Sequence, residues 1–113
     1  MMRILMRSVG VLPAVTSAAQ AATRGKAIYT ANCAGCHAPT GAGMVGPNLK
    51  EAAGWSYVLF KRAMLQGKDD KGVVFKAPMP VWGKVGFAGD HGKAPTAAEL
   101  KALQAYLNTL KFK

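Results

Sequence analysis

The sequence is poor in the residues that most enzyme and metal sites require. It has two cysteines and two histidines in 113 residues, whereas a structural zinc site takes about four such ligands. Its 5 acidic residues are scattered over expected turns and form no carboxylate pair for acid–base catalysis. Glycine-rich phosphate loops are missing as well. These shortages argue against carboxylate-based catalysis, nucleotide binding and structural zinc.

Acidic side chains are outnumbered by 15 lysines and arginines, which gives a formal net charge of +10. Such a charge favours solubility and steers acidic partners towards the protein. Nucleic acid is another polyanion, but the chain has no zinc finger, RNA-binding signature or basic helix. We therefore expect acidic partner proteins and no nucleic acid.

Aromatic residues make up only 8% of the chain, although half of it is apolar. A small domain of this kind is marginally stable and gains from a cofactor or a staple in its core. The sequence contains no internal repeat and no linker, so it predicts a single domain.

The first 21 residues have the features of an export signal. Arg3 and Arg7 make the start positive, a modest apolar stretch follows, and Ala19-Gln20-Ala21 has the small-x-small form of a cleavage site. The apolar stretch is far too short to span a membrane. We predict a signal peptide at 1–21, a mature domain at 22–113 and a periplasmic location. The alternative is a disordered N-terminal tail.

The chemistry of the chain is concentrated in Cys33-Ala34-Gly35-Cys36-His37. Two thiols three positions apart, followed at once by a histidine, form the attachment pattern of a c-type haem. Residues i and i+3 share one face of a helical turn, so both thiols can reach the two vinyl groups of one porphyrin. The motif predicts one haem c bound covalently to Cys33 and Cys36, with His37 as the proximal iron ligand.

Two thiols at this spacing also occur in dithiol redox sites and in half of many zinc sites. A dithiol site favours a preceding strand in a βαβ unit, and the sequence predicts neither. Zinc would lack ligands, because the only other histidine is His91. A disulfide between the two cysteines would leave His37 without a role. A redox dithiol without haem stays open as the alternative.

Apolar periodicity predicts several helices. One helix is expected over 23–34, with Thr23 as its N-cap, and another over 51–66, with Gly67 as its C-cap. Gly25 is unusual inside the first helix, because glycine costs about 1 kcal/mol there relative to alanine. We expect another element to approach it closely.

The last helix is the clearest. Thr96 and Glu99 form a capping box at its start, and leucines recur along one face from Leu100 to Leu110. This face is expected to pack on the first helix. Tyr106, stacked near Gly25, would explain the missing side chain there.

Glycine and proline mark 37–48 and 68–95 as loops. In the first loop, the Pro47 carbonyl is a suitable acceptor for the second ring N–H of an iron-ligating histidine. In the second, prolines on both sides of Met79 are expected to keep its backbone extended, so that its thioether can serve as the distal iron ligand.

Trp82 is expected to close the Met79 loop or to pack on the haem edge, with its N–H reaching a polar partner such as a propionate. Three further side chains could reach iron by type alone. Met44 is interpreted as loop packing and Met64 as core. His91 is interpreted as an exposed loop residue and is the alternative sixth ligand.

Taken together, these residues resemble class I mono-haem bacterial cytochromes c. The resemblance rests on Gly25 and Tyr29, on the haem motif, on Gly46-Pro47-Asn48-Leu49, on Met79-Pro80-Val81-Trp82-Gly83 and on the final helix. It implies an all-α fold, the small cytochrome c fold of three to five helices around one haem, with the first and last helices crossed. It also implies His37 and Met79 as axial ligands. The glycine-rich stretch from Lys84 to Lys93 has no counterpart in this pattern.

The resemblance implies a one-electron carrier, and not an enzyme, that works between periplasmic or membrane redox proteins. Lys26, Lys76 and Lys84 neighbour the expected haem-contacting segments, so we expect them to steer acidic donors and acceptors. Peripheral association with a membrane also fits the charge. The alternatives are a subunit of a larger dehydrogenase or oxidase complex, and a ligand-binding haem sensor with an open sixth position.

Overall fold

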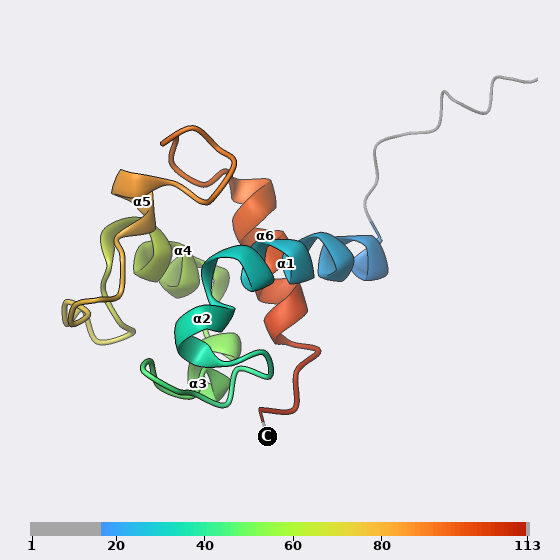
Figure 1. Ribbon diagram of the computed structural model, residues 1–113, viewed down its shortest axis with the longest axis horizontal. Helices are drawn as coiled ribbons and strands as arrows, with labels where there is room; N and C mark the ends of the chain where they lie inside the picture. The colour runs from blue at the N-terminus through green and yellow to red at the C-terminus, as the bar shows by residue number, and fades with distance from the viewer. Residues whose placement is uncertain (1–16, 113) are drawn as a thin grey trace, which may run out of the picture.

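The computed structural model describes residues 17–112, so most of the predicted signal peptide lies outside the described part. Three of its helices exceed one turn and three are single turns. In chain order they are α1 (Ala18–Asn32), α2 (Ala34–His37), α3 (Lys50–Ala53), α4 (Tyr57–Gln66), α5 (Trp82–Val85) and α6 (Ala97–Leu107) (Figure 1).

The all-α prediction is confirmed. The described residues contain one isolated β-bridge, between Lys68 and Val74, and no longer strand pairing. Six helices are more than the three to five expected, because α2, α3 and α5 are 4-residue turns too short to show periodicity. Over 17–112, no helix has the length and apolar character needed to span a bilayer.

Helices α1 and α6 cross at the centre of the fold (Figure 1). Tyr29 from α1 and Leu100 and Leu103 from α6 are fully buried, and the Tyr29 and Tyr106 rings lie 5.5 Å apart. A Cβ at Gly25 would overlap the Ala102 carbonyl and would lie 2.8 Å from Cβ of Tyr106. The predicted contact is therefore confirmed, and the α6 backbone is the main reason for the glycine.

Helix α1 begins earlier than predicted. Its N-cap is Ser17, whose hydroxyl accepts from the Gln20 N–H at 3.1 Å while the Gln20 side chain accepts from the Ser17 N–H. The prediction of Thr23 as the cap is wrong, since Thr23 lies within the helix and its hydroxyl donates to the Ala19 carbonyl. The capping box was not predicted, because Gln20 was assigned to the cleavage site at 19–21.

The helix predicted over 51–66 is interrupted. Helix α3 ends at Ala53, and α4 starts anew with Ser56 as its N-cap, whose hydroxyl accepts from the Leu59 N–H at 3.3 Å. A serine that bonds to the backbone in this way favours a helix start over a helix interior. Gly67 ends α4 in the left-handed conformation, as predicted, with φ of 71°.

Candidate functional site

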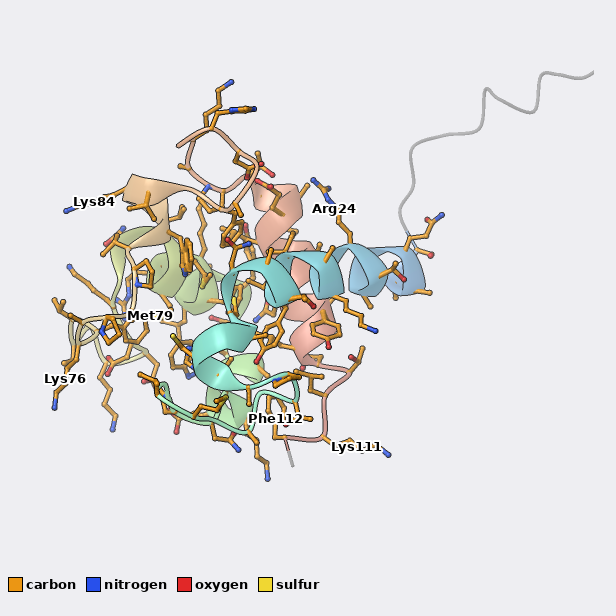
Figure 2. All side chains as sticks on the ribbon, in the orientation of Figure 1. Arg24, Lys76, Met79, Lys84, Lys111 and Phe112 are labelled. Atoms are coloured by element: carbon orange, nitrogen blue, oxygen red, sulfur yellow. The ribbon has the colours of Figure 1, made fainter. Side chains whose placement is uncertain are left out.

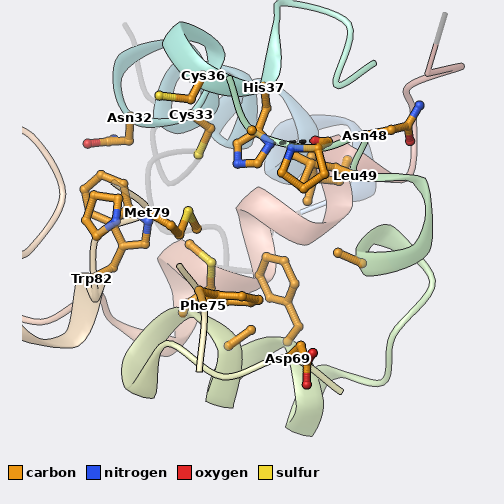
Figure 3. Close-up of a pocket in the computed structure, with 18 of the residues that line it drawn as sticks. Asn32, Cys33, Cys36, His37, Asn48, Leu49, Asp69, Phe75, Met79 and Trp82 are labelled. Atoms are coloured by element: carbon orange, nitrogen blue, oxygen red, sulfur yellow. Dashed lines mark hydrogen bonds between the residues drawn. The ribbon is translucent and has the colours of Figure 1, made fainter. Parts of the chain in front are cut away.

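A cavity of about 690 Å³ lies between α2, α4, the end of α6 and the loops that contain Pro47 and Met79 (Figure 3). This volume is within the usual range for small-molecule and cofactor sites. The cavity brings together residues from two distant parts of the sequence, Cys33, Cys36 and His37 from one and Met79 and Trp82 from the other. Its wall is largely apolar and includes Leu49, Phe60, Ala63, Met64, Leu103 and Leu107.

The His37 ring is fixed in the cavity wall. It is 6% exposed, and Nδ1 lies 2.8 Å from the Pro47 carbonyl oxygen (Figure 3). A carbonyl can only accept, so Nδ1 carries the proton and Nε2 keeps a free lone pair. The hydrogen bond predicted between these residues is present, and it selects the tautomer that can ligate a metal through Nε2.

Gly46 supports the same ring from the loop backbone. A Cβ at Gly46 would lie 2.6 Å from Cε1 and 2.8 Å from Nδ1 of His37. The loop is tied back by hydrogen bonds from Gly43 N–H to the His37 carbonyl (2.9 Å) and from Gly46 N–H to the Cys36 carbonyl (2.7 Å). Gly46 is thus a residue of the site. The sequence analysis includes it only as part of the segment Gly46-Pro47-Asn48-Leu49 and gives it no role.

The two cysteines lie on one helical turn that lines the cavity. The N–H groups of Cys36 and His37 donate to the Cys33 carbonyl at 3.2 and 3.0 Å. Both thiols are free, Cys33 buried and Cys36 exposed. Burial, with a smaller contribution from Cys36, raises the pKa of the Cys33 thiol to about 12. Redox dithiols use a lowered pKa, so Cys33 lacks the character of a redox nucleophile.

Met79 lines the cavity from a tight turn. Its N–H donates to the Lys76 carbonyl at 3.1 Å, and the Ala77–Pro78 peptide bond is cis. The prediction of an extended loop around Met79 is therefore wrong, because this hydrogen bond closes a turn over 76–79 that reverses the chain. Figure 3 shows the half-buried Met79 side chain at the cavity, on a different wall from His37.

The Met79 turn is fastened to the end of α4 on both sides. Before it, Phe75 N–H donates to the Gly67 carbonyl at 2.8 Å. After it, a Cβ at Gly67 would lie 2.9 Å from Val81 Cγ2, and Gly83 packs directly on the Leu65 carbonyl. The position of Met79 is therefore set by the end of α4 and not by its own neighbours alone.

Trp82 is buried in α5 with its ring 5.2 Å from Phe87. Its Nε1–H has no hydrogen-bond partner within 17–112, and the same holds for Nε1–H of Trp55. Both side chains line the cavity. Trp55 falls within the helix predicted over 51–66, but it lies in the turn between α3 and α4. Two buried donors without protein partners fit a ligand that carries acceptor groups.

The other possible iron ligands, Met64, Met44 and His91, differ in burial and in whether they line the cavity. Met64 is 5% exposed and borders the cavity from the core face of α4. Met44 is 66% exposed, so it does not pack as predicted. His91 is an exposed turn residue, as expected, and neither it nor Met44 lines the cavity. Across 17–112, no three His, Cys, Asp or Glu side chains gather as a metal site.

The lysines expected at the site are placed unevenly. Lys76 lines the cavity, whereas Lys26 and Lys84 are exposed and do not. Figure 2 shows Lys76 and Lys84 on the same side of the molecule as Met79, with Arg24 and Lys111 elsewhere. Of the three lysines expected at the site, Lys76 alone therefore lines the cavity.

Comparison with known proteins identifies a family for this chain. The sequence model of the family Cytochrome c matches residues 22–111. No curated protein and no solved structure matches the chain. The match spans most of the chain and includes every residue of the cavity wall named above.

The cavity fits the haem that this family binds. It is mostly apolar, two free thiols on one helical turn border it, and two buried indole N–H groups lie in its wall. Cys33 and Cys36 have the spacing that thioether attachment requires. The chain therefore belongs to the cytochrome c family and is a haem-based electron carrier with a covalently bound c-type haem.

Proposed function

We propose that the protein is a one-electron carrier in which His37 and Met79 are the two axial ligands of the haem iron. The observation that carries this proposal is the cavity itself, which His37 and Met79 both line although 41 residues separate them in sequence. His37 presents a free Nε2 because Nδ1–H is bonded to Pro47.

When bound, the haem supplies a reversible one-electron change at iron. The Pro47 carbonyl fixes the His37 ring and increases its basicity. Met79 would hold the iron through its thioether, a ligand type that favours the reduced state and would exclude oxygen. The apolar wall excludes water from the iron. The buried N–H groups of Trp55 and Trp82 would donate to its propionates.

A visible spectrum of holoprotein from a host that attaches c-type haem tests the ligation. We expect sharp bands in the reduced protein and a weak sulfur-to-iron band in the oxidised protein. Met79→Ala should abolish the weak band. Met44→Ala is the control, because Met44 is exposed and away from the cavity. A weak band that survives Met79→Ala, or rapid carbon monoxide binding by the reduced protein, would refute Met79 as ligand.

The partners proposed are acidic redox proteins that dock where Lys76 and Lys84 flank the Met79 side (Figure 2). Charge reversal at Lys26, Lys76 and Lys84 together should slow association at low salt and weaken its salt dependence. Lys111→Glu is the control, since Lys111 lies away from Met79 in Figure 2. Equal effects of the two changes would refute directed docking.

The location proposed is the periplasm, reached through a signal in residues 1–21. The mass of the protein recovered after export tests this. Removal of 21 residues supports the proposal, and recovery of the uncut chain from the cytoplasm contradicts it.

A further inference from the structure

Between α4 and the Met79 turn, the chain forms a closed loop over 67–75, here called the anchored loop. Its ends meet through the hydrogen bond from Phe75 N–H to the Gly67 carbonyl and through the bridge between Lys68 and Val74. Phe75, the last residue of the loop, lines the cavity. The next residue, Lys76, accepts the hydrogen bond of the Met79 N–H, so the loop leads directly into the ligand turn.

Asp69 organises the interior of the anchored loop. Its Oδ1 accepts from the N–H groups of Lys71 (2.8 Å) and Val73 (2.9 Å), and its own N–H donates to the Val73 carbonyl. The hydrogen bond from Val73, helped by that from Lys71 and by nearby positive charge, holds the pKa of Asp69 below its ordinary value. The loop therefore has a defined shape although it contains no helix or strand.

Arg62 links this loop to α4. Its Nη2 donates to the Asp69 carbonyl at 2.7 Å. The side chain is half-buried, and its buried Nε has no partner within 17–112. The preceding residue, Lys61, is exposed. Withdrawing a guanidinium from water costs free energy unless its hydrogen bonds are worth more, so the bond to Asp69 accounts for the inward position of Arg62.

We propose that Arg62 is a positioning residue for Met79. This inference depends on the proposed role of Met79 as distal ligand. A thioether is only a weak hydrogen-bond acceptor, so the protein cannot orient it through polar contacts as it orients His37. It must fix the backbone instead. Arg62 does so by holding Asp69, and with it the anchored loop, against α4.

The test compares holoprotein with Arg62→Gln, Arg62→Lys and Lys61→Gln. Amide hydrogen exchange at Val73 and Phe75 should become about ten- to a hundredfold faster in Arg62→Gln, as expected when a bond from a charged donor is lost. Arg62→Lys keeps the charge and one donor, so it should restore part of the protection. Lys61→Gln removes a charge from the same helix without touching the loop and should change neither amide.

Urea titration supplies a second readout. In Arg62→Gln, the sulfur-to-iron band should disappear at a lower urea concentration than the helical signal, whereas both should disappear together in Lys61→Gln. Faster exchange confined to the loop, together with early loss of the band, supports the proposal. Unchanged exchange, an unchanged band midpoint, or exchange accelerated equally in α1 and α6 overturns it. A Met79→Ala spectrum identical to the parent's would instead show that the proposed ligation itself is wrong.

Discussion

His37 and Met79 lie in the same cavity, but the protein holds them by different means. The His37 ring is buried, bonded to the Pro47 carbonyl and backed by Gly46. Met79 is half-buried and is tied through its backbone N–H to Lys76. An imidazole has a ring N–H through which a neighbour can hold it, and a thioether has no donor. The histidine side is therefore rigid by direct contact, and the methionine side depends on a loop fastened to α4.

The largest effect is expected from Gly25→Ala, which disturbs the crossing of α1 and α6. Helix α1 leads directly into α2, which ends at His37. The new Cβ would overlap the Ala102 carbonyl, and a backbone cannot move aside as a side chain does. We expect the free energy of unfolding to fall by about 3 kcal/mol, measured by urea titration. Gly54→Ala is the control, because its Cβ would meet only the Glu51 carbonyl at 3.5 Å. Equal stability of the two variants would contradict the close crossing.

Gly46→Ala tests the histidine side itself. The added methyl would lie 2.6 Å from Cε1 of His37, so either the ring or the loop must shift, at about 1–3 kcal/mol. We expect a lower free energy of unfolding and an altered haem spectrum. The sulfur-to-iron band should weaken because His37, the other proposed iron ligand, is displaced. An unchanged spectrum would show that the loop backbone moves to accommodate the methyl group. Gly46 would then not hold the His37 ring as firmly as its contacts indicate.

Tyr29→Phe probes the support behind His37, because the Tyr29 hydroxyl donates to the carbonyl of Ala38. Burial raises the pKa of Tyr29 to about 12, against about 10 in an unfolded chain. Between these values the folded state keeps a proton that the unfolded state releases, so stability falls as pH rises from 10 to 12.

At neutral pH we expect Tyr29→Phe to be about 1 kcal/mol less stable, since it loses a hydrogen bond. Above pH 10 its stability should fall less steeply than the parent's. Urea unfolding at pH 7 to 11.5 measures both. Parallel pH curves would show that Tyr29 does not contribute to the alkaline decline.

The smallest effect is expected from Asp69→Asn on the methionine side. Because the pKa of Asp69 is lowered by the Val73 N–H, the stability that its carboxylate provides is present above about pH 3.9 and is lost as pH falls through the folded value. The sulfur-to-iron band of the parent should therefore weaken in acid more than that of Asp69→Asn. Asp70→Asn is the control on the same turn and should follow the parent.

Features that depend on residues close in sequence were predicted well. The capping box of Thr96 and Glu99 is present, with bonds of 2.8 and 3.1 Å, and Gly67 ends α4. The bond between His37 and Pro47 spans only 10 residues. Such features follow from side-chain chemistry and local backbone preference, so the sequence was enough.

Helix boundaries and loop conformations were predicted less well where different sequence preferences compete. Apolar periodicity continues across 51–66, yet Ser56 caps a new helix and Trp55 turns into the cavity. Prolines around Met79 suggested an extended segment, and a turn forms instead. In each case a hydrogen bond or a packing contact overrides the average preference of the residues, and periodicity carries no information about that outcome.

By itself, the sequence determined the haem motif, the all-α class, the capping box of the last helix and the residue types at each side of the cavity. Only the tertiary structure decided that the anchored loop lies against α4, that Arg62 reaches Asp69, and that two indole N–H groups find no partner among residues 17–112. The reason is physical. Attachment and capping are satisfied within a few residues, whereas the position of Met79 depends on how separate elements pack, and packing is a property of the whole chain.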